Sequence, residues 1–348
     1  NVINLSTSLR HKVELVITEL VRIFEDNNKI LLLYSGGKDS TLVMHLALEA
    51  YLTLNPTDTY LFVASVNTLV DIPAISKLVE NFINNLNQWA RENALNIEGV
   101  ILTPKVEDRF WSLLLGKGYP MPNFHFRWCV DRLKIKPVAN FINKIEPEVI
   151  LLGSRLQESS ARSKNLKARL IDGKWQKYRT RGMKKEFFIK AFLPILDWTT
   201  NEVWEYLLEA KTPWQDGYRE LVQLYIKFDT CELSNPFAPK CDGSRFGCWT
   251  CSVVKRDRAL EALAKDGDIQ ASKFLNLKEF LIDFTRDINN RVIDKNGKPR
   301  KLKLEKRKFL FEKLLKEFLY IEHLGGSDSP LISNEEIEYI HKIWREEL

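Results

Sequence analysis

The chain has 348 residues, of which 45% are hydrophobic and 28% charged, proportions that favour a soluble globular protein over a disordered one. No stretch approaches the about 18 consecutive apolar residues of a membrane helix, and no signal-like segment opens the chain, so neither membrane insertion nor secretion is indicated and we expect a cytoplasmic protein. Five cysteines in such a chain favour metal or redox chemistry over a disulfide scaffold.

The net charge of +6 is unevenly distributed along the chain. Residues Arg155–Lys190 contain 12 Lys and Arg against 3 acids, and Lys295–Lys308 contain 8 against 1. Basic stretches of this kind suggest a polyanionic partner, with solvated surface lysines as the alternative.

A predicted helix and strand lead into a glycine-containing loop near the start of the chain. The helix is predicted over Ser8–Glu25, and an apolar run of buried-strand length covers Lys29–Tyr34. After the loop, apolar residues recur at helical spacing, at Leu42, Val43, Leu46, Ala47 and Ala50. The loop therefore joins a strand to a helix.

The loop has the sequence Ser35-Gly36-Gly37-Lys38-Asp39-Ser40. Glycines let backbone N–H groups turn towards an anion, the helix N-terminus adds the positive end of its dipole, and Lys38 supplies a point charge. These features predict a phosphate cradle, although the spacing differs from the G-x-x-x-x-G-K-[ST] loop. Asp39 is placed either to position Mg²⁺ or to cap the helix.

Three further strands are predicted in the first half of the chain: Thr59–Ser65, Ile97–Leu102 and Glu148–Leu152, with a helix over about Ala74–Asn93. Strands separated by helical stretches predict an α/β fold, a mostly parallel sheet with helices on both faces. Ligands bind such sheets beyond the carboxyl ends of the strands, where the loop lies. We therefore expect the other site residues to converge there.

A glycine and proline loop at Gly116–Pro120 precedes a block of basic residues. Within that block, Arg127, Arg132 and Lys134 are candidates for holding phosphate. Cys129 lies among them, and a packed structural cysteine is the simpler interpretation of it.

A second basic block follows the fourth predicted strand. Gly153 stands where that strand ends, and Arg155, Glu158 and Arg162 come after it at a spacing that suits a phosphorylated substrate. Further on, Thr199 or Thr200 is the predicted N-cap of a helix.

Four cysteines, Cys231, Cys241, Cys248 and Cys251, form the pattern C-x9-C-x6-C-x2-C. The final C-x2-C can place two thiolates on one metal centre, and the glycines and prolines between the cysteines can form a loop around it. Four thiolates suit either tetrahedral zinc or an iron–sulfur cluster, and the spacing does not decide between them.

The chain after Asp257 is predicted to be helical, with a polar turn at Asp294–Pro299 and a capping box that starts a last helix at Ser333. We expect three parts in total: a nucleotide-binding domain over residues 1–230, a cysteine segment over 231–254 and a helical subdomain over 255–348.

The loop at Ser35–Ser40 resembles the SGGKDS signature of the PP-loop ATP pyrophosphatases. The order of this loop, the Arg-Trp-Cys-x-x-Arg-Leu-Lys block and the Gly-x-Arg-x-x-Glu-Ser-x-x-Arg block resembles the phosphoadenosine-phosphosulfate reductase-like branch. Within it the chain is most similar to the DndC-type proteins and their SspD relatives, because of Asn67–Val70, Gly116–Pro120 and the four cysteines. The resemblance covers about Leu31 to Cys251.

This resemblance implies that ATP and Mg²⁺ are used to adenylylate a DNA backbone phosphate before sulfur replaces one of its oxygens. It implies a 4Fe-4S cluster on the four clustered cysteines, leaving Cys129 over. The expected partners are DNA, a cysteine desulfurase and other subunits of a DNA sulfur-modification complex. The implied cofactor-binding residues are Ser35–Ser40, Gly153 and Arg127. The implied catalytic residues are Lys38, Asp39, Arg155 and Glu158, and the residues expected to hold a DNA or substrate phosphate are Arg132, Lys134, Arg155 and Arg162.

Three other functions fit parts of the pattern. One is tRNA base thiolation, which uses the same loop, and another is a DNA-binding subunit whose nucleotide site is only a sensor. The third, reduction of a sulfonucleotide, is disfavoured by comparison with the sulfonucleotide reductases. Those typically carry a cysteine in a C-terminal Glu-Cys-Gly segment, and their iron–sulfur members an adjacent Cys-Cys pair, whereas here no cysteine follows Cys251 and no two cysteines are adjacent.

Overall fold

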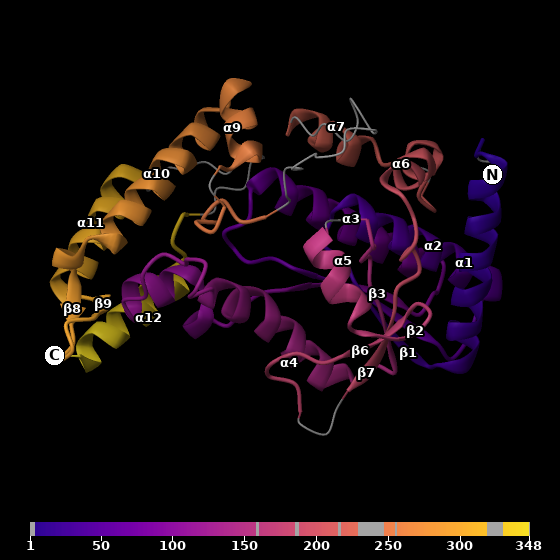
Figure 1. Cartoon of the computed structure of the whole chain (residues 1–348), viewed down its shortest axis with the longest axis horizontal. Coiled ribbons are helices and arrows are strands. Elements are labelled where there is room, and N and C mark those ends of the chain that lie inside the picture. The colour runs from indigo at the N-terminus through magenta and orange to yellow at the C-terminus, as the bar shows by residue number, and fades with distance from the viewer. Residues whose placement is uncertain are drawn as a thin grey trace.

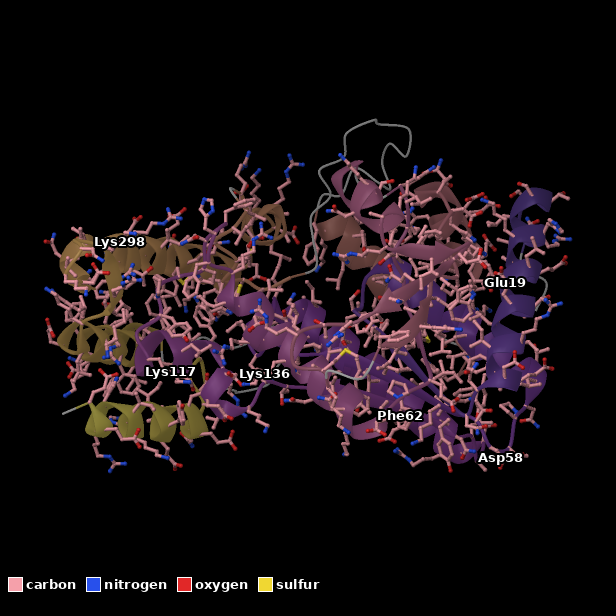
Figure 2. The ribbon with its side chains drawn as sticks, turned by 60° about the horizontal axis from the view of Figure 1, so that its bottom comes forward. Glu19, Asp58, Phe62, Lys117, Lys136 and Lys298 are labelled. Carbon is pink, nitrogen blue, oxygen red and sulfur yellow. The ribbon has the colours of Figure 1, made fainter. Side chains whose placement is uncertain are left out.

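The computed structural model describes residues 4–157, 160–184, 188–214, 217–228, 247–254, 256–318 and 330–347. Figure 1 shows two regions, with the sheet and the helices α1 (Thr7–Asp26) and α2 (Lys38–Leu54) on the right and the C-terminal helices on the left. In Figure 2 the labelled residues Lys117 and Lys298 lie in the left-hand region, Phe62 lies in the sheet, and Lys136 lies between the two.

Within the described ranges, the main sheet has seven strands in the order β3-β2-β1-β4-β7-β6-β5. The five strands β3, β2, β1, β4 and β7 are parallel, which confirms the predicted α/β sheet. Their bounds are β1 Lys29–Leu33, β2 Tyr60–Val66, β3 Ile97–Leu102, β4 Val149–Leu151 and β7 Ile189–Phe192. All four strands predicted from apolar runs are present, each within one residue at either end.

An antiparallel pair, β5 (Leu170–Asp172) and β6 (Trp175–Tyr178), extends the sheet beyond β7. These two strands were not predicted from the sequence. They are short and lie in a lysine-rich segment, so no apolar run or alternation marks them. The basic segment therefore forms a sheet edge.

The sheet is covered on both faces, as predicted. Ile30 and Leu32 of β1 share a core with α1, α2, α3 (Pro73–Glu92), α6 (Thr200–Glu209) and α7 (Arg219–Lys227). Leu31 faces the other way and packs with α4 (Lys136–Ile145). This alternation follows from the strand geometry, in which successive side chains point to opposite faces.

The C-terminal helices pack on a second core away from the sheet. Those helices are α9 (Arg258–Lys265), α10 (Ile269–Arg286), α11 (Leu304–Phe318) and α12 (Asn334–Glu346), and they enclose residues of the 110–133 segment. Trp344 of α12 donates its indole N–H to the carbonyl of Leu115 at 2.9 Å, which ties the last helix to that segment. The helical character of this region is as predicted, and the Ser333 capping box is present.

The predicted polar turn at Asp294–Pro299 forms the tip of a β-hairpin rather than a simple link between helices. The hairpin pairs β8 (Arg291–Ile293) with β9 (Pro299–Leu302). Among the described residues, no helix is both long and apolar enough to cross a membrane.

Candidate functional site

The predicted phosphate loop lies between β1 and α2, at the carboxyl end of the sheet. Gly36 has φ +79°, and a Cβ there would meet Val79 Cγ2 at 2.5 Å, so only glycine fits. Ser40 accepts the N–H of Ser35 at 3.1 Å, and their hydroxyl oxygens are 2.9 Å apart. Gly37 is the N-cap of α2, and no side-chain hydrogen bond caps this end of the helix. The loop and the N-terminus of α2 thus have the strand-to-helix geometry in which backbone N–H groups bind an anion.

Gly153 lies directly against this loop. A Cβ at Gly153 would come within 2.9 Å of the Ser40 nitrogen and 3.0 Å of the Asp39 carbonyl carbon. Since both contacts are to backbone, a larger residue would displace the start of α2. The structure thus brings together Gly153 and the loop, two motifs more than a hundred residues apart in the chain.

Arg155 holds Asp39 in place. Its Nε donates to Asp39 Oδ1 at 2.7 Å, and its remaining nitrogens donate to the Trp198 carbonyl at 3.0 Å and to Thr200 Oγ1 at 3.2 Å. The Arg155 residue is 2% exposed. These contacts give Arg155 a positioning role behind the loop, and its predicted contact with an acceptor phosphate stays a prediction.

Lys38 is the other charged residue of the loop, and it is buried. Its Nζ lies 3.6 Å from Asp39 Oδ2 and 5.5 Å from the centre of the Tyr225 ring. Its backbone N–H donates to the Tyr225 hydroxyl at 3.1 Å. Tyr225, on α7, was not predicted, since no local pattern connects it with a loop almost two hundred residues earlier.

A cavity of about 320 Å³ lies beyond the carboxyl ends of β1, β2 and β3. Its volume is at the lower end of the range for small-molecule sites. Ser35 of the phosphate loop lines it, and so do Asp71, Lys134 and Gly247 from three other segments. Of the predicted site residues, Ser35 and Lys134 therefore share this cavity.

Cys248 is attached to the loop that follows β2. Asp71 and Cys248 form a β-bridge, and the Cys248 thiol donates to Asp71 Oδ1 at 3.3 Å. The hydroxyl of Thr68 lies 3.3 Å from the same sulfur. Burial raises the pKa of the Cys248 thiol, and the Asp71 carboxylate raises it further. Within the Cys-x2-Cys turn, Cys251 donates its backbone N–H to the carbonyl of Cys248 at 3.1 Å.

Lys134 and Cys129 lie beside this turn. Lys134 interacts most strongly with Cys248, and also with Asp71, Cys251 and Cys129, and these neighbours raise its pKa. Burial raises the pKa of the Cys129 thiol, and Cys251 raises it further. The Cys129 thiol lies close enough to Cys251 for the two groups to interact electrostatically, and its exclusion from the ligand set stays a prediction.

The other predicted metal ligands, Cys231 and Cys241, lie outside the described residues. Among the residues that are described, no group of three His, Cys, Asp or Glu side chains is arranged to hold a single metal ion. Cys248 and Cys251 are joined by a backbone hydrogen bond within their turn, and their role as metal ligands stays a prediction.

The remaining predicted phosphate ligands are dispersed. Arg132 donates to the buried Asp108 at 2.9 Å, and Lys136 pairs with the same carboxylate. Arg127 is exposed and lies 4.7 Å from the centre of the Phe124 ring. The side chains of Glu158 and Arg162 fall outside the described part of the chain.

The model of the phosphoadenosine phosphosulfate reductase domain matches residues 29–254, which is more than half of the chain. The chain belongs to this family. The matched range contains the phosphate loop, the cavity and every cysteine of the chain. This family is part of the PP-loop superfamily, in agreement with the glycine-containing loop at Ser35–Ser40.

Two curated relatives are uncharacterized proteins of Methanocaldococcus jannaschii. One is 27% identical over 193 residues, or 55% of this chain, and the other is 28% identical over 174 residues, or 50% of this chain. The match covers 34% of each relative, so this chain spans about a third of their length.

Two solved structures are distantly similar to the chain. Phosphoadenylyl-sulfate reductase from Candida auris is 17% identical with a TM-score of 0.40, and the match covers 65% of this chain and 95% of that one. The U34-tRNA thiolase NcsA from Methanococcus maripaludis, solved with its [4Fe-4S] cluster, is 16% identical with a TM-score of 0.33. The match covers 82% of this chain and 86% of that one.

Proposed function

We propose that the protein uses ATP and Mg²⁺ to adenylylate a DNA backbone phosphate, which activates it for replacement of one oxygen by sulfur. The observation that carries this proposal is the shared cavity. Ser35 of the phosphate loop lines it together with Asp71 and Gly247, which contact or adjoin Cys248. A site that combines nucleotide and thiol chemistry needs the phosphate loop and the cysteine segment at one cavity, because the activated phosphate must react with sulfur before it leaves the protein.

The first step is attack of a non-bridging DNA phosphate oxygen on the α-phosphorus of ATP. A new P–O–P link forms, the bond to the pyrophosphate breaks, and pyrophosphate leaves with its electron pair. Lys38 and the N–H groups at the start of α2 stabilise the charge that develops on the leaving group. Asp39, oriented by Arg155, would hold Mg²⁺, which neutralises the phosphates when bound.

In the second step, sulfur at the oxidation level of sulfide attacks the activated DNA phosphorus. AMP departs with the original oxygen, and the phosphorothioate remains. Sulfide needs no further electrons for this displacement. Lys134 lies in the cavity lining beside Cys248, where its positive charge attracts anionic sulfur and phosphate alike. The predicted iron–sulfur cluster, which the Cys248 and Cys251 turn would help to hold, would supply or store that sulfur.

The basic sheet edge supports DNA as the acceptor. Lys177 of β6 and Lys190 of β7 are directly opposite in the antiparallel ladder, and both are exposed. Like charges directly opposite one another destabilise a sheet, and a phosphate backbone relieves that repulsion. Exposed Arg169 and Arg179 add to the same edge. We propose that this edge holds the DNA backbone while the reacting phosphate enters the cavity.

The test is release of pyrophosphate from ATP with and without duplex DNA. The proposal predicts release that requires Mg²⁺, rises with DNA, and is lost in Lys38→Ala, while Lys144→Ala, an exposed lysine of α4, behaves as the wild type. Stimulation by tRNA but not by duplex DNA would favour base thiolation instead. Release that is unaffected by Lys38→Ala would exclude catalysis at this loop.

A further inference from the structure

Residues 123–127 form a loop that presents aromatic side chains to solvent, and we call it the aromatic loop. Phe124 is 70% exposed and Phe126 is 46% exposed, and His125 between them is exposed as well. Burial of a phenylalanine ring stabilises a fold, and this loop leaves two such rings out of the core. Exposed apolar side chains that gather at one place often mark a surface that another molecule covers.

The aromatic loop is held in shape by its own hydrogen bonds. The backbones of Asn123 and Phe126 each donate an N–H to the carbonyl of the other, at 3.3 Å and 3.2 Å. The side-chain oxygen of Asn123 accepts the backbone N–H groups of His125 and Phe126, both at 2.9 Å. The backbone that carries the rings is therefore ordered before any ligand binds, which lowers the conformational entropy lost on binding.

Contacts on the inner side anchor the aromatic loop to the second core. The ring of Tyr119 packs against those of Phe126 and Trp128, with centres 5.9 Å and 5.6 Å apart. Just before the loop, the backbone N–H of Met121 donates to the buried hydroxyl of Thr285, on α10, at 3.0 Å. The aromatic loop is therefore a firm projection from a buried base.

The exposed ring of Phe124 is paired with an arginine. The guanidinium carbon of Arg127 lies 4.7 Å from the centre of this ring, and the ring of His125 meets it edge to face at 5.5 Å. Aromatic rings and planar guanidinium groups are both surfaces on which nucleobases stack. Every base has a π-face, so such a surface accepts a base without requiring a particular sequence.

The charge around the aromatic loop favours nucleic acid as the molecule that covers it. Residues 123–136 contain four Lys and Arg against one acid, Asp131. That acid pairs at 3.3 Å with Arg181, which belongs to the basic stretch Arg155–Lys190. Positive charge of this kind attracts a phosphate backbone, which an uncharged apolar partner lacks.

The same segment connects the aromatic loop with the cavity. A π-helix, Val130–Ile135, follows the loop, and its residue Lys134 lines the cavity. Lys136, directly after the π-helix, lies between the two regions of the molecule in Figure 2. The aromatic loop is thus linked to the basic stretch through Asp131 and to the cavity through Lys134.

We propose that the aromatic loop stacks an unpaired base of the DNA that the protein binds, with the base against Phe124 and Arg127 and beside Phe126. In a duplex, the neighbouring base pairs cover both faces of each base, so the base must first leave the stack. This inference rests on the proposed function for its DNA substrate. It adds the form of that substrate, a DNA site at which one base near the reacting phosphate is out of the helix.

The test is fluorescence anisotropy with the full chain, without ATP, on two duplexes of equal length and charge. One is fully paired, and the other has an abasic site that leaves one base unpaired. The wild type should bind the second at least about fivefold more tightly. Phe124→Leu/Phe126→Leu keeps apolar side chains but removes the rings, so it should bind both duplexes equally, with the affinity for paired DNA unchanged.

Two further variants control this measurement. Phe309→Leu replaces a phenylalanine of α11 that is 55% exposed, and it should keep the preference of the wild type. Phe124→Trp retains a stacking surface and should keep or increase that preference. An unchanged urea midpoint for Phe124→Leu/Phe126→Leu shows that this variant is folded.

A wild type without the preference, or an equal preference in Phe124→Leu/Phe126→Leu, would overturn the stacking site. A preference shown only with RNA duplexes would overturn DNA as its ligand. If the leucine variant instead lost self-association or binding to phosphatidylserine vesicles, with both DNA affinities unchanged, the loop would be a docking surface of another kind. Because ATP is absent, the result does not depend on adenylylation. A failure of label transfer from ATP to DNA, with the base preference intact, would overturn the proposed function alone.

Discussion

The backbone N–H of Lys38 donates to the hydroxyl of Tyr225 at 3.1 Å, which joins the phosphate loop to α7. Tyr225 thereby occupies a donor at the helix N-terminus that a phosphate group would also use. Because α7 ends at Lys227, only a few residues before Cys231, the same helix connects the loop with the cysteine segment in sequence. If ATP binds at this loop as proposed, its phosphates and the Tyr225 hydroxyl compete for the Lys38 N–H.

Tyr225→Phe should tighten ATP binding. Without the tyrosine hydroxyl, a phosphate oxygen can bind the Lys38 N–H and has no tyrosine hydrogen bond to displace. In the wild type, displacing the tyrosine hydrogen bond costs about 1 kcal/mol. The variant avoids this cost, so its Kd for ATP should be about fivefold lower when measured by calorimetry. Tyr206→Phe, which removes a hydroxyl bonded to Glu49, is the matched control and should leave the Kd unchanged. Weaker binding by Tyr225→Phe would show that the hydroxyl contacts the nucleotide itself.

Gly153→Ala should impair the loop without touching the nucleotide. Its Cβ would lie 2.9 Å from the Ser40 nitrogen, so the start of α2 must move. We expect at least about tenfold weaker ATP binding and a loss of about 1–3 kcal/mol in the free energy of unfolding, measured with urea. Gly217→Ala, whose Cβ would make only an ordinary contact at 3.7 Å, is the control. Equal ATP affinities for the two variants would mean that the close approach of Gly153 does not shape the loop.

Arg155→Ala should destabilise the fold because Asp39 loses its closer buried partner and retains Lys38 at 3.6 Å. The expected loss in the free energy of unfolding is about 3 kcal/mol, at the lower end for a broken buried ion pair because Asp39 is partly exposed. Lys12→Ala breaks the more exposed pair with Glu202 and should cost no more than about 1 kcal/mol. If Arg155 acted only on the substrate, its removal would change turnover and leave the urea midpoint in place.

The strands and helix ends could be predicted from sequence because their signals are local. The apolar run at Lys29–Tyr34, the N-cap at Thr199 or Thr200 and the capping box at Ser333 are each marked by a few neighbouring residues. The structure has the strand, an N-cap at Thr199 and the capping box. The contacts that assemble the site are long-range. Nothing near Arg155 indicates that its partner is Asp39, and no spacing rule links Cys129 with Cys251.

The edge strands β5 and β6 show a different limit of sequence reasoning. Lys177 and Lys190 face each other in the ladder, and the pairing of two lysines runs against β-propensity and pairing rules alike. A strand pairing that its own residues disfavour is expected where function requires those residues at the expense of stability. The basic charge was visible in the sequence, but its arrangement as a sheet edge was not.

The Lys177 and Lys190 pair gives a prediction about salt. If these residues neutralise DNA phosphates, Lys177→Ala/Lys190→Ala should reduce the steepness of log Kd against log salt by about 0.9 for each phosphate left without its lysine, or about 2 in all. The control, Lys144→Ala/Lys273→Ala, removes two lysines elsewhere and should leave the slope unchanged. Filter binding to duplex DNA at several salt concentrations measures both, and equal slopes would place the DNA elsewhere.

Asp71→Asn should change the reactivity of Cys248 with pH in the metal-free protein. The Asp71 carboxylate disfavours the thiolate and so raises the pKa of Cys248, in addition to the larger effect of burial. Removing that negative charge lowers the pKa, so thiolate forms at lower pH and alkylation at a fixed pH near about 8 becomes several-fold faster. Asp172→Asn, an exposed acid of β5, should have no effect. An unchanged pH profile for Asp71→Asn would mean that burial alone controls this thiol.

Transfer of label from ATP to DNA reports directly whether the protein adenylylates a DNA phosphate. The chain would be incubated with duplex DNA, Mg²⁺ and ATP labelled at the α-phosphate, with no sulfur donor present, and the DNA isolated. Adenylylation of the backbone predicts label on the DNA that is absent with Lys38→Ala and is released as AMP when sulfide is added. Pyrophosphate release with no label on DNA, or label that appears only on tRNA, would contradict it.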